Sequence, residues 1–198
     1  MSKVFLVLKR MLSMFIQTQE TPNPQSLMFL PGRPVLDDMD PVSFSKNDTC
    51  STSPFAKKLL SVDGIENVFF GSDFITLTKN QDAEWFQLKP HVLGFIMEHF
   101  VNQFPVMIAS ETQEDKPIES DDPIFKTLQD LIDTRVRPAV ANDGGDIILK
   151  KFEDGIVYLK MKGACSGCPS SSVTLKSGIE NMLKFYVPEV IEVRQVDD

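Results

Sequence analysis

The 198-residue chain has no long apolar run, only three cysteines and two histidines, and no excess of positive charge. A membrane-spanning helix needs about 20 consecutive apolar residues. No uninterrupted run approaches that length, so we expect no membrane insertion. Three cysteines are also too few for the disulfide framework of a small secreted domain. Two of them form a close pair, which favours metal or redox chemistry in a reducing compartment.

The charge balance excludes a further class of partner. The formal net charge is −8 and the pI is near 4.8. Proteins that bind nucleic acid usually present a basic face to the phosphates, so the composition predicts no nucleic-acid partner. The sequence also lacks a Ser/His/Asp arrangement, a carboxylate pair or a phosphate-binding loop that stands out, and we therefore expect a protein that is not an enzyme.

Residues 1–13 form a leader of distinct composition. They contain lysine and arginine, and the first acidic residue of the chain is Glu20. The apolar cluster at residues 4–8 is too short for the core of a secretory signal. The leader resembles the end of an organelle transit peptide, which is basic, amphipathic and poor in acids. The alternative is a mildly basic chain terminus.

An acidic segment divides the remainder into two parts. Residues 110–121, SETQEDKPIESD, contain a proline and a single large apolar residue, Ile118. Such a segment buries too little apolar surface to offset the entropy lost on ordering. It therefore predicts a linker between a domain of residues 14–109 and a domain of residues 122–198, and hydrophobic residues, 42% of the chain, suffice for two small cores.

Both domains read as small α+β folds resembling α/β sandwiches. The first has the order ββαββα: strands over 14–19 and 26–30, a polar loop over 37–53, a helix from Pro54 with Ser53 as N-cap, a hairpin about residues 71–73, and a helix over 88–104. The second has the order αββαβ: a helix from Pro123 with Asp122 as N-cap, stopped by Pro138, a hairpin about residues 153–155, a helix over 169–186, and a strand near 190–193.

A DGGD sequence at residues 143–146 permits a metal or phosphate site. It equally fits a tight turn, in which the glycines supply positive φ angles and the aspartates cap neighbouring elements. A single DGGD is a weak signal, and we favour the turn.

The cysteine pair lies in the loop before the second domain's last helix. Cys165 and Cys168 are separated by Ser166 and Gly167, and Pro169 opens the helix. Two intervening residues let both sulfurs converge on one atom. The helix N-terminus, with its free N–H groups and positive dipole end, favours the thiolate, which is the form that binds metal.

One chain does not supply a complete set of metal ligands. A structural zinc site or an iron–sulfur cluster takes four. The other candidates are Cys50, His91 and His99, all in the first domain. The two histidines are eight residues apart on a helix, so their directions differ by about 80°. Two copies of the second domain would supply four thiolates from Cys165 and Cys168.

Three uses of the pair remain open on spacing alone: a shared iron–sulfur centre, a structural zinc clip in a dimer, and thiol–disulfide exchange. Thioredoxin-like sites place the first cysteine at a helix start, usually after an aromatic residue and inside a βαβ unit. Here Ala164 precedes Cys165, both cysteines lie before the helix, and the predicted strands form an antiparallel hairpin.

Two long segments carry a resemblance to a known family. The C-terminal domain of NifU-like (Nfu-type) iron–sulfur cluster scaffold proteins resembles RPAVANDGGDIILKKFEDGIVYLKMKGACSGCPSSSVTLKSGIENML. The N-terminal domain of their mitochondrial members is similar to FIQTQETPNPQSLMFLPGRPVL together with SPFAKKLLSVDGIENVFFGSDFITLTK. The two matches cover nearly all of residues 14–196.

The resemblance implies a carrier that assembles or receives a [4Fe–4S] cluster in the mitochondrial matrix. It implies a homodimer in which Cys165 and Cys168 of both chains hold one cluster. It also implies upstream assembly factors that load the cluster, and delivery to client apoproteins such as lipoyl synthase and respiratory subunits. The N-terminal domain would modulate partner contact and supply no ligand. Cys50 matches no motif of the family. We interpret it as an incidental thiol, and the alternative is a regulatory role or an extra ligand.

Overall fold

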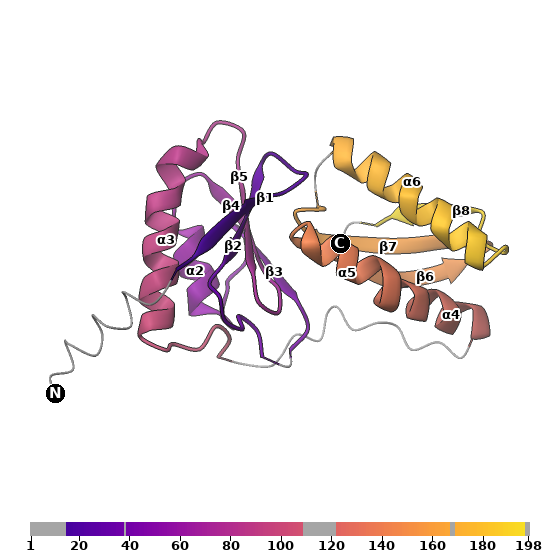
Figure 1. The fold of residues 1–198 in the computed structure, drawn as a ribbon, viewed down its shortest axis with the longest axis horizontal. Coiled ribbons are helices and arrows are strands. Elements are labelled where there is room, and N and C mark those ends of the chain that lie inside the picture. Colours follow the sequence, from indigo (N-terminus) through magenta and orange to yellow (C-terminus); the bar gives the residue numbers. More distant parts are fainter. Residues whose placement is uncertain (1–14, 38, 109–121, 167–168, 197–198) are drawn as a thin grey trace, which may run out of the picture. The chain divides into compact units, whose positions relative to one another are not determined.

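The computed structural model describes residues 15–37, 39–108, 122–166 and 169–196, and the side chains of residues 169–174 are outside that description. The chain divides into two compact units, Met1–Glu111 and Thr112–Asp198, and each combines a sheet with helices (Figure 1). The predicted α+β fold class is confirmed. The predicted leader, residues 1–13, and the predicted linker, residues 110–121, lie outside the described residues.

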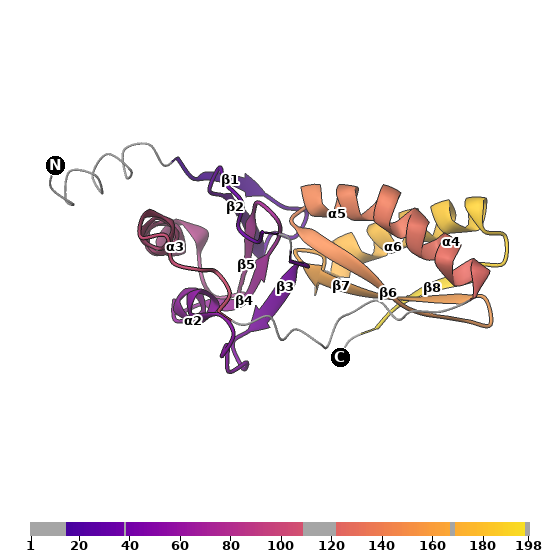
Figure 2. The same cartoon turned by 90° about the horizontal axis from the view of Figure 1, so that it is seen from below.

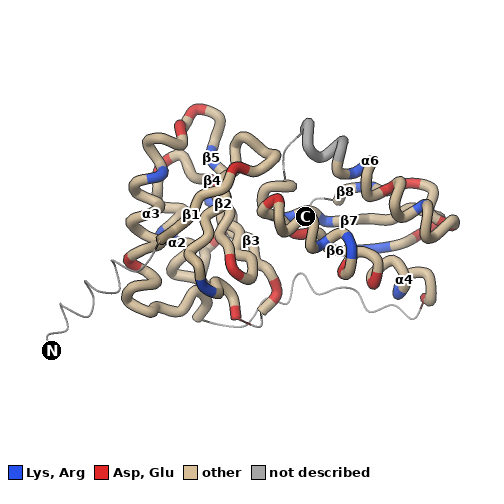
Figure 3. The backbone as a smooth tube through the Cα atoms, in the orientation of Figure 1, with Lys and Arg blue, Asp and Glu red and all other residues tan. Residues whose placement is uncertain are grey.

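Acidic and basic residues occur in both units (Figure 3), and no described helix is long and apolar enough to span a membrane.

The first unit is a five-stranded antiparallel sheet with helices on one face. Its strands are β1 (Gln17–Glu20), β2 (Ser26–Leu30), β3 (Val42–Ser45), β4 (Ile65–Phe70) and β5 (Ile75–Lys79), in the order β1-β2-β5-β4-β3. Helices α2 (Pro54–Leu60) and α3 (Trp85–Val101) cover the same face (Figures 1 and 2). Alternate strand residues point toward these helices and form the core, among them Leu27, Phe29, Val68, Phe70, Ile75 and Leu77.

The predicted loop over residues 37–53 is wrong at its centre, where β3 adds a strand to the expected order. The sequence VSFS is short and flanked by polar residues, so its local signal is weak. Phe44 is buried opposite Val68 of β4, and this pairing with a neighbouring strand stabilises the extended segment.

Ser53 fixes helix α2 to the segment that follows α3. Its hydroxyl accepts a hydrogen bond from the N–H of Ala56 at 3.1 Å, as an N-cap does, and donates one to the carbonyl of Val106 at 2.6 Å. The side chain is fully buried, so neither partner can turn to water once the hydroxyl is lost.

We expect Ser53→Ala to lower the free energy of unfolding of the first unit by about 2 kcal/mol, because a cap and a second buried hydrogen bond are lost together. Urea titration followed by tryptophan fluorescence measures it, since the only tryptophan, Trp85, is in this unit. Ser61→Ala is the matched control: its hydroxyl donates to Lys58 at an exposed position, and its loss should cost under about 0.5 kcal/mol. Equal losses for the two variants would contradict this account of Ser53.

His99 of α3 is buried among aromatic rings. It stacks on Phe55 with ring centroids 3.7 Å apart, and its Nε2 has no hydrogen-bond partner among the described residues. Burial, followed by the positive charge of Lys58, lowers the pKa of His99 to about 4. The unfolded chain takes up this proton near pH 6.5, whereas the folded chain does so only near pH 4.

The contribution of His99 to stability is therefore complete above pH 6.5 and is lost as the pH falls toward 4. Between pH 7 and pH 5 the first unit should lose about 2 kcal/mol of unfolding free energy from this residue. Urea titrations at both pH values should show a smaller difference for His99→Phe than for the wild type. His91→Gln, which removes an exposed histidine of the same helix, should leave the wild-type difference unchanged. An unaltered difference in His99→Phe would contradict the assignment.

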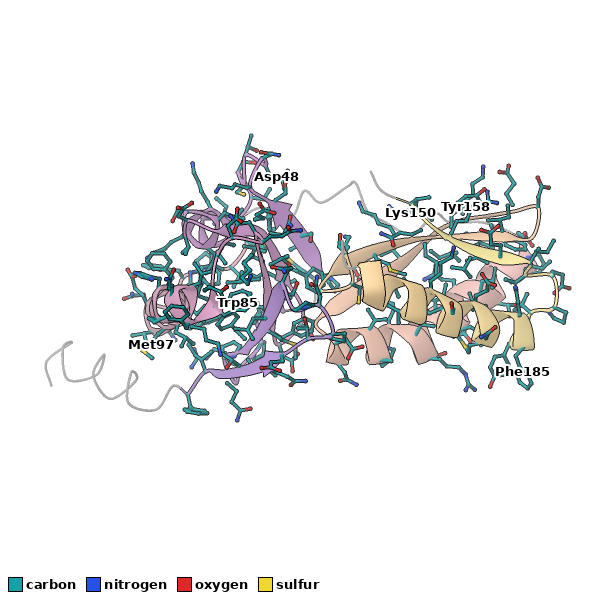
Figure 4. The ribbon with its side chains drawn as sticks, turned by 90° about the horizontal axis from the view of Figure 1, so that it is seen from above. Asp48, Trp85, Met97, Lys150, Tyr158 and Phe185 are labelled. Carbon is teal, nitrogen blue, oxygen red and sulfur yellow. The ribbon has the colours of Figure 1, made fainter. Side chains whose placement is uncertain are left out.

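The second unit is a three-stranded sheet with helices on one face (Figure 2). Strands β6 (Gly145–Glu153) and β7 (Ile156–Gly163) are antiparallel, and β8 (Glu192–Gln195) runs parallel to β7. A continuous helical segment consists of α4 (Pro123–Leu131), the π-helical turn η1 (Ile132–Val136) and α5 (Arg137–Asn142), and a second helix is α6 (Pro169–Tyr186). Lys150 and Tyr158 project from the other face of the sheet, away from α6 (Figure 4).

The prediction that Pro138 stops the first helix of this unit is wrong. Proline lacks an N–H group and its ring clashes with the carbonyl four residues earlier, which normally ends a helix. Here the N–H of Arg137 bonds to the carbonyl of Ile132, five residues back. This π turn widens the helix just before Pro138, so the helical segment continues to Asn142.

The parallel pairing of β8 also removes one argument against thiol–disulfide exchange, namely that the cysteine loop does not lie inside a βαβ unit. The β6–β7 hairpin is present as predicted, but the cysteine loop lies between β7 and α6, and β7–α6–β8 is a βαβ unit. The final strand was expected near residues 190–193 and occupies Glu192–Gln195.

Candidate functional site

Cys165 lies in the turn that leads out of β7. It is 6% exposed, and its side chain belongs to the hydrophobic core of the second unit together with Ile147 and Met161. Cys168, the other predicted site residue, lies outside the described residues. The structure therefore places one of the two predicted sulfur ligands, at the end of a strand and close to the start of α6 at Pro169.

Backbone geometry bends the chain sharply before this cysteine. Gly163 ends β7 with a φ of +65°, in the left-handed region that residues with a side chain rarely adopt. The N–H of Ser166 then bonds to the carbonyl of Gly163 at 3.1 Å, which closes a tight turn around Cys165. This turn requires a positive φ at position 163, which explains why a glycine occupies it.

Cys165 packs against the backbone of the DGGD turn, residues 143–146, which forms one wall of the site. Gly144 has a φ of +80°, and its carbonyl accepts a hydrogen bond from the N–H of Ala164 at 3.1 Å. A Cβ added to Gly145 would lie 2.8 Å from Sγ of Cys165 and 2.7 Å from the carbonyl oxygen of Lys162. Only a residue without a side chain fits between the β6 backbone and the cysteine.

An ion pair holds the start of β6 in place. Nε of Arg137 donates to Oδ1 of Asp146 at 2.8 Å, and Nη2 donates to Oδ2 at 3.0 Å, which is the bidentate geometry of a strong guanidinium–carboxylate pair. Asp146 is 4% exposed, and the hydrogen bonds to its carboxylate raise the pKa of Arg137. Asp133 adds a third contact, at 3.3 Å from Nη1 of Arg137.

The remaining sequence candidates lie in the first unit and do not form a site. Cys50 is buried in the hydrophobic core with a φ of +48°, and burial raises the pKa of its thiol. His91 is exposed and His99 is packed among aromatic rings. Within the described ranges, no group of three or more His, Cys, Asp and Glu side chains could hold a metal ion.

The site has two parts that the sequence interpretation treated separately. The cysteine loop was identified from its spacing. The DGGD sequence was correctly interpreted as a turn, but its contact with Cys165 was missed, as was the role of Arg137. The only sequence signal for that contact is the second glycine, since a turn alone needs positive φ at Gly144 and not at Gly145.

Comparisons with known proteins point to one family. Residues 16–103 match the family model described as the N-terminal domain of scaffold protein Nfu/NifU, and residues 128–194 match the model of a NifU-like domain. The chain is 51% identical over 187 residues to the protein of Drosophila sechellia named NFU1 iron–sulfur cluster scaffold homolog, mitochondrial, and 50% identical to its counterpart in Drosophila erecta. These alignments cover 94% of this chain and 66% of each relative, so the chain spans about two thirds of their length.

A solved structure is also similar. The solution structure of a NifU-like protein from Saccharomyces cerevisiae is 23% identical in the aligned region, with a TM-score of 0.45, and the alignment covers 49% of this chain and 87% of that chain.

Proposed function

Because the chain belongs to the Nfu/NifU family of scaffold proteins, we propose that it carries an iron–sulfur cluster as cargo and delivers it to apoproteins that require one. The observation that supports this most directly is the placement of Cys165, held by glycine backbone on a turn that leads into the N-terminus of a helix. The first turn of that helix contains no acidic residue that would oppose a thiolate.

The proposed ligands are Cys165 and Cys168 from each of two chains, which together supply four thiolates to one [4Fe–4S] cluster. Thiolates are soft donors that suit iron–sulfur clusters and zinc rather than magnesium or calcium. A shared cluster makes homodimerisation part of binding, because neither chain completes the site alone.

In this proposal the chain's residues bind and release the cargo without redox change. Gly145 and the turn at Gly163 set the position of the Cys165 thiolate, and the helix dipole of α6 moderates its charge. A client thiolate then attacks iron and displaces a Cys165 or Cys168 thiolate, so one Fe–S bond forms as another breaks. No bond to substrate carbon is made, in keeping with a carrier that is not an enzyme.

The compartment is the mitochondrion, as for the named relatives. We propose the matrix as the location, assembly factors as the source of the cluster, and apoproteins such as lipoyl synthase and respiratory subunits as clients. This part follows from the family resemblance, and the clients are recognised by the cysteines with which they take over the iron.

Anaerobic reconstitution with iron and sulfide tests the proposal. Mössbauer spectroscopy of the product should show a [4Fe–4S] cluster, and an added apoprotein acceptor should gain that cluster with matching loss from the carrier. A zinc clip instead predicts stoichiometric zinc in protein purified without oxygen and no transferable cluster. Thiol–disulfide exchange predicts turnover in an insulin-reduction assay with thioredoxin reductase, and either result would refute the carrier proposal.

A further inference from the structure

The ion pair between Arg137 and Asp146 lies next in sequence to Gly145, on which the Cys165 sulfur packs, although neither residue is a candidate ligand. We propose that Arg137 and Asp146 are positioning residues: they hold the start of β6 so that the Gly145 backbone fixes where the Cys165 sulfur lies. This inference rests on the proposed function, in which that sulfur binds the cluster.

The π turn η1 brings Arg137 to strand β6. A π turn adds one residue to a helical turn, so the residues after it are rotated by about 100° relative to an uninterrupted α-helix. Arg137 is the first residue after η1, and its own N–H makes the π-type bond to Ile132. The rotation directs Arg137 toward β6, where the guanidinium bonds both carboxylate oxygens of Asp146.

Backbone pairing connects Asp146 to the turn that carries Cys165. Asp146 follows Gly145 directly, and β6 pairs with β7 so that Gly145 lies opposite Gly163 and Asp146 lies opposite Lys162. Gly144, on the other side of Gly145, accepts the hydrogen bond from Ala164. The strand start is therefore fixed at both neighbours of Gly145, and a shift of either neighbour moves the wall that contacts Sγ.

The Cys165 sulfur fits closely against the backbone of Gly145. The position of a Cβ on Gly145 lies 2.8 Å from Sγ, closer than atoms of neighbouring groups approach, so the sulfur packs directly on the backbone. Asp146 is buried, and the guanidinium of Arg137 compensates the charge of its carboxylate through two hydrogen bonds. Loss of the pair would release the strand start, and Cys165 would no longer be confined to its buried position.

A purely stabilising ion pair makes a different prediction. It would lower the stability of the whole unit without a specific effect on Cys165. The pair between Lys184 and Glu180 offers the matched control: it lies in the same unit, its Nζ–Oε1 distance is 2.6 Å, and Glu180 also accepts a hydrogen bond from the N–H of Val193. Glu180→Gln therefore removes an ion pair of the same unit that does not border the cysteine loop. Its carboxylate is more exposed than that of Asp146, so this variant controls for the loss of an ion pair in general.

The experiment measures alkylation of Cys165 in the full-length, cluster-free protein. Iodoacetamide is added to a Cys168→Ser background, so that the peptide containing Cys165 carries one thiol, and mass spectrometry follows its modification. Asp146→Asn removes a negative charge, whereas Arg137→Lys keeps the charge and loses the bidentate geometry. Circular dichroism establishes that each variant is folded at the assay temperature.

We expect both Asp146→Asn and Arg137→Lys to raise the alkylation rate of Cys165 at least about tenfold, and Glu180→Gln to change it less than about twofold. An increase in Asp146→Asn alone would overturn positioning in favour of a charge effect on the thiol. Equal increases in all three variants would overturn it in favour of general destabilisation, and no increase in either variant of the pair would overturn it outright.

A second readout separates this proposal from the proposed function. With Cys168 restored, reconstituted Arg137→Lys protein should lose its cluster to an iron chelator at least several-fold faster than the wild type. If wild-type protein takes up no cluster, the proposed function fails while the alkylation result still decides whether Arg137 and Asp146 position Cys165. If the wild type and Arg137→Lys lose the cluster at the same rate, the positioning proposal fails and the proposed function stands.

Discussion

Replacement of Cys165 or Cys168 by serine is expected to abolish cluster binding and cluster-dependent dimerisation. Each substitution removes two of the four thiolates of a shared site, because both chains of the dimer carry it. Serine is close in size to cysteine, but its hydroxyl is not ionised at neutral pH and is a hard, weak ligand for iron. Iron and sulfide retained after reconstitution and desalting should fall to below about a tenth of the wild-type amount.

Cys50→Ser provides the control, since it removes a thiol in the core of the first unit. It should leave iron and sulfide uptake unchanged, although a buried hydroxyl in place of a thiol will lower the stability of that unit. Size-exclusion chromatography should give a dimer for reconstituted wild type and Cys50→Ser, and a monomer for the two site variants. A full complement of iron and sulfide in Cys165→Ser or Cys168→Ser would refute the assignment of the ligands.

Gly145→Ala is expected to damage the site without touching a ligand. The added methyl group would lie 2.7 Å from the Lys162 carbonyl and 2.8 Å from Sγ of Cys165, so strand β7 or the cysteine has to move. Overpacking of this kind costs about 1–3 kcal/mol. For a unit of this size that cost lowers the thermal midpoint by about 10 °C, and scanning calorimetry measures it. Cluster retention should fall together with stability, because the displaced atom is the proposed iron ligand.

Gly178→Ala is the matched substitution in the same unit. Gly178 lies in α6, and a Cβ there meets nothing within 4 Å. Alanine should therefore raise the stability by about 0.5–1 kcal/mol through its higher helix propensity, and leave cluster retention unchanged. If Gly145→Ala behaves like Gly178→Ala in both measurements, Gly145 is not the wall of the site.

Local signals in the sequence were sufficient for most helices and hairpins. Ser53 before Pro54, and Asp122 before Pro123, predict two helix starts, and the structure has caps at both. These predictions succeed because a cap and a first-turn proline act within three residues of each other.

The two wrong predictions, a loop in place of β3 and a helix end at Pro138, share a physical cause. In each case the structure depends on something that the local sequence does not show: a distant partner strand for β3, and an unusual helix geometry at Pro138. Strand β3 exists because Phe44 pairs with Val68, more than twenty residues away. The helix continues through Pro138 because a π turn precedes it, and the local sequence contains no signal that predicts this turn.

The candidate site divides in the same way. The spacing of Cys165 and Cys168 predicts the ligands, because two cysteines in one loop need no tertiary information to converge. The contact between Gly145 and Cys165, and the pair between Arg137 and Asp146, join elements that are brought together only by the β6–β7 pairing and the π turn. The cysteine spacing therefore predicts the sulfur ligands, whereas the contacts around Cys165 emerge only from the folded structure.

Native mass spectrometry of the anaerobically reconstituted protein tests the central claim most directly, because it counts chains and inorganic atoms in one particle. The account predicts a species of two polypeptides that together carry four irons and four sulfides, and a cluster-free species of either variant, Cys165→Ser or Cys168→Ser. A single polypeptide that holds the whole cluster through its own side chains would contradict it.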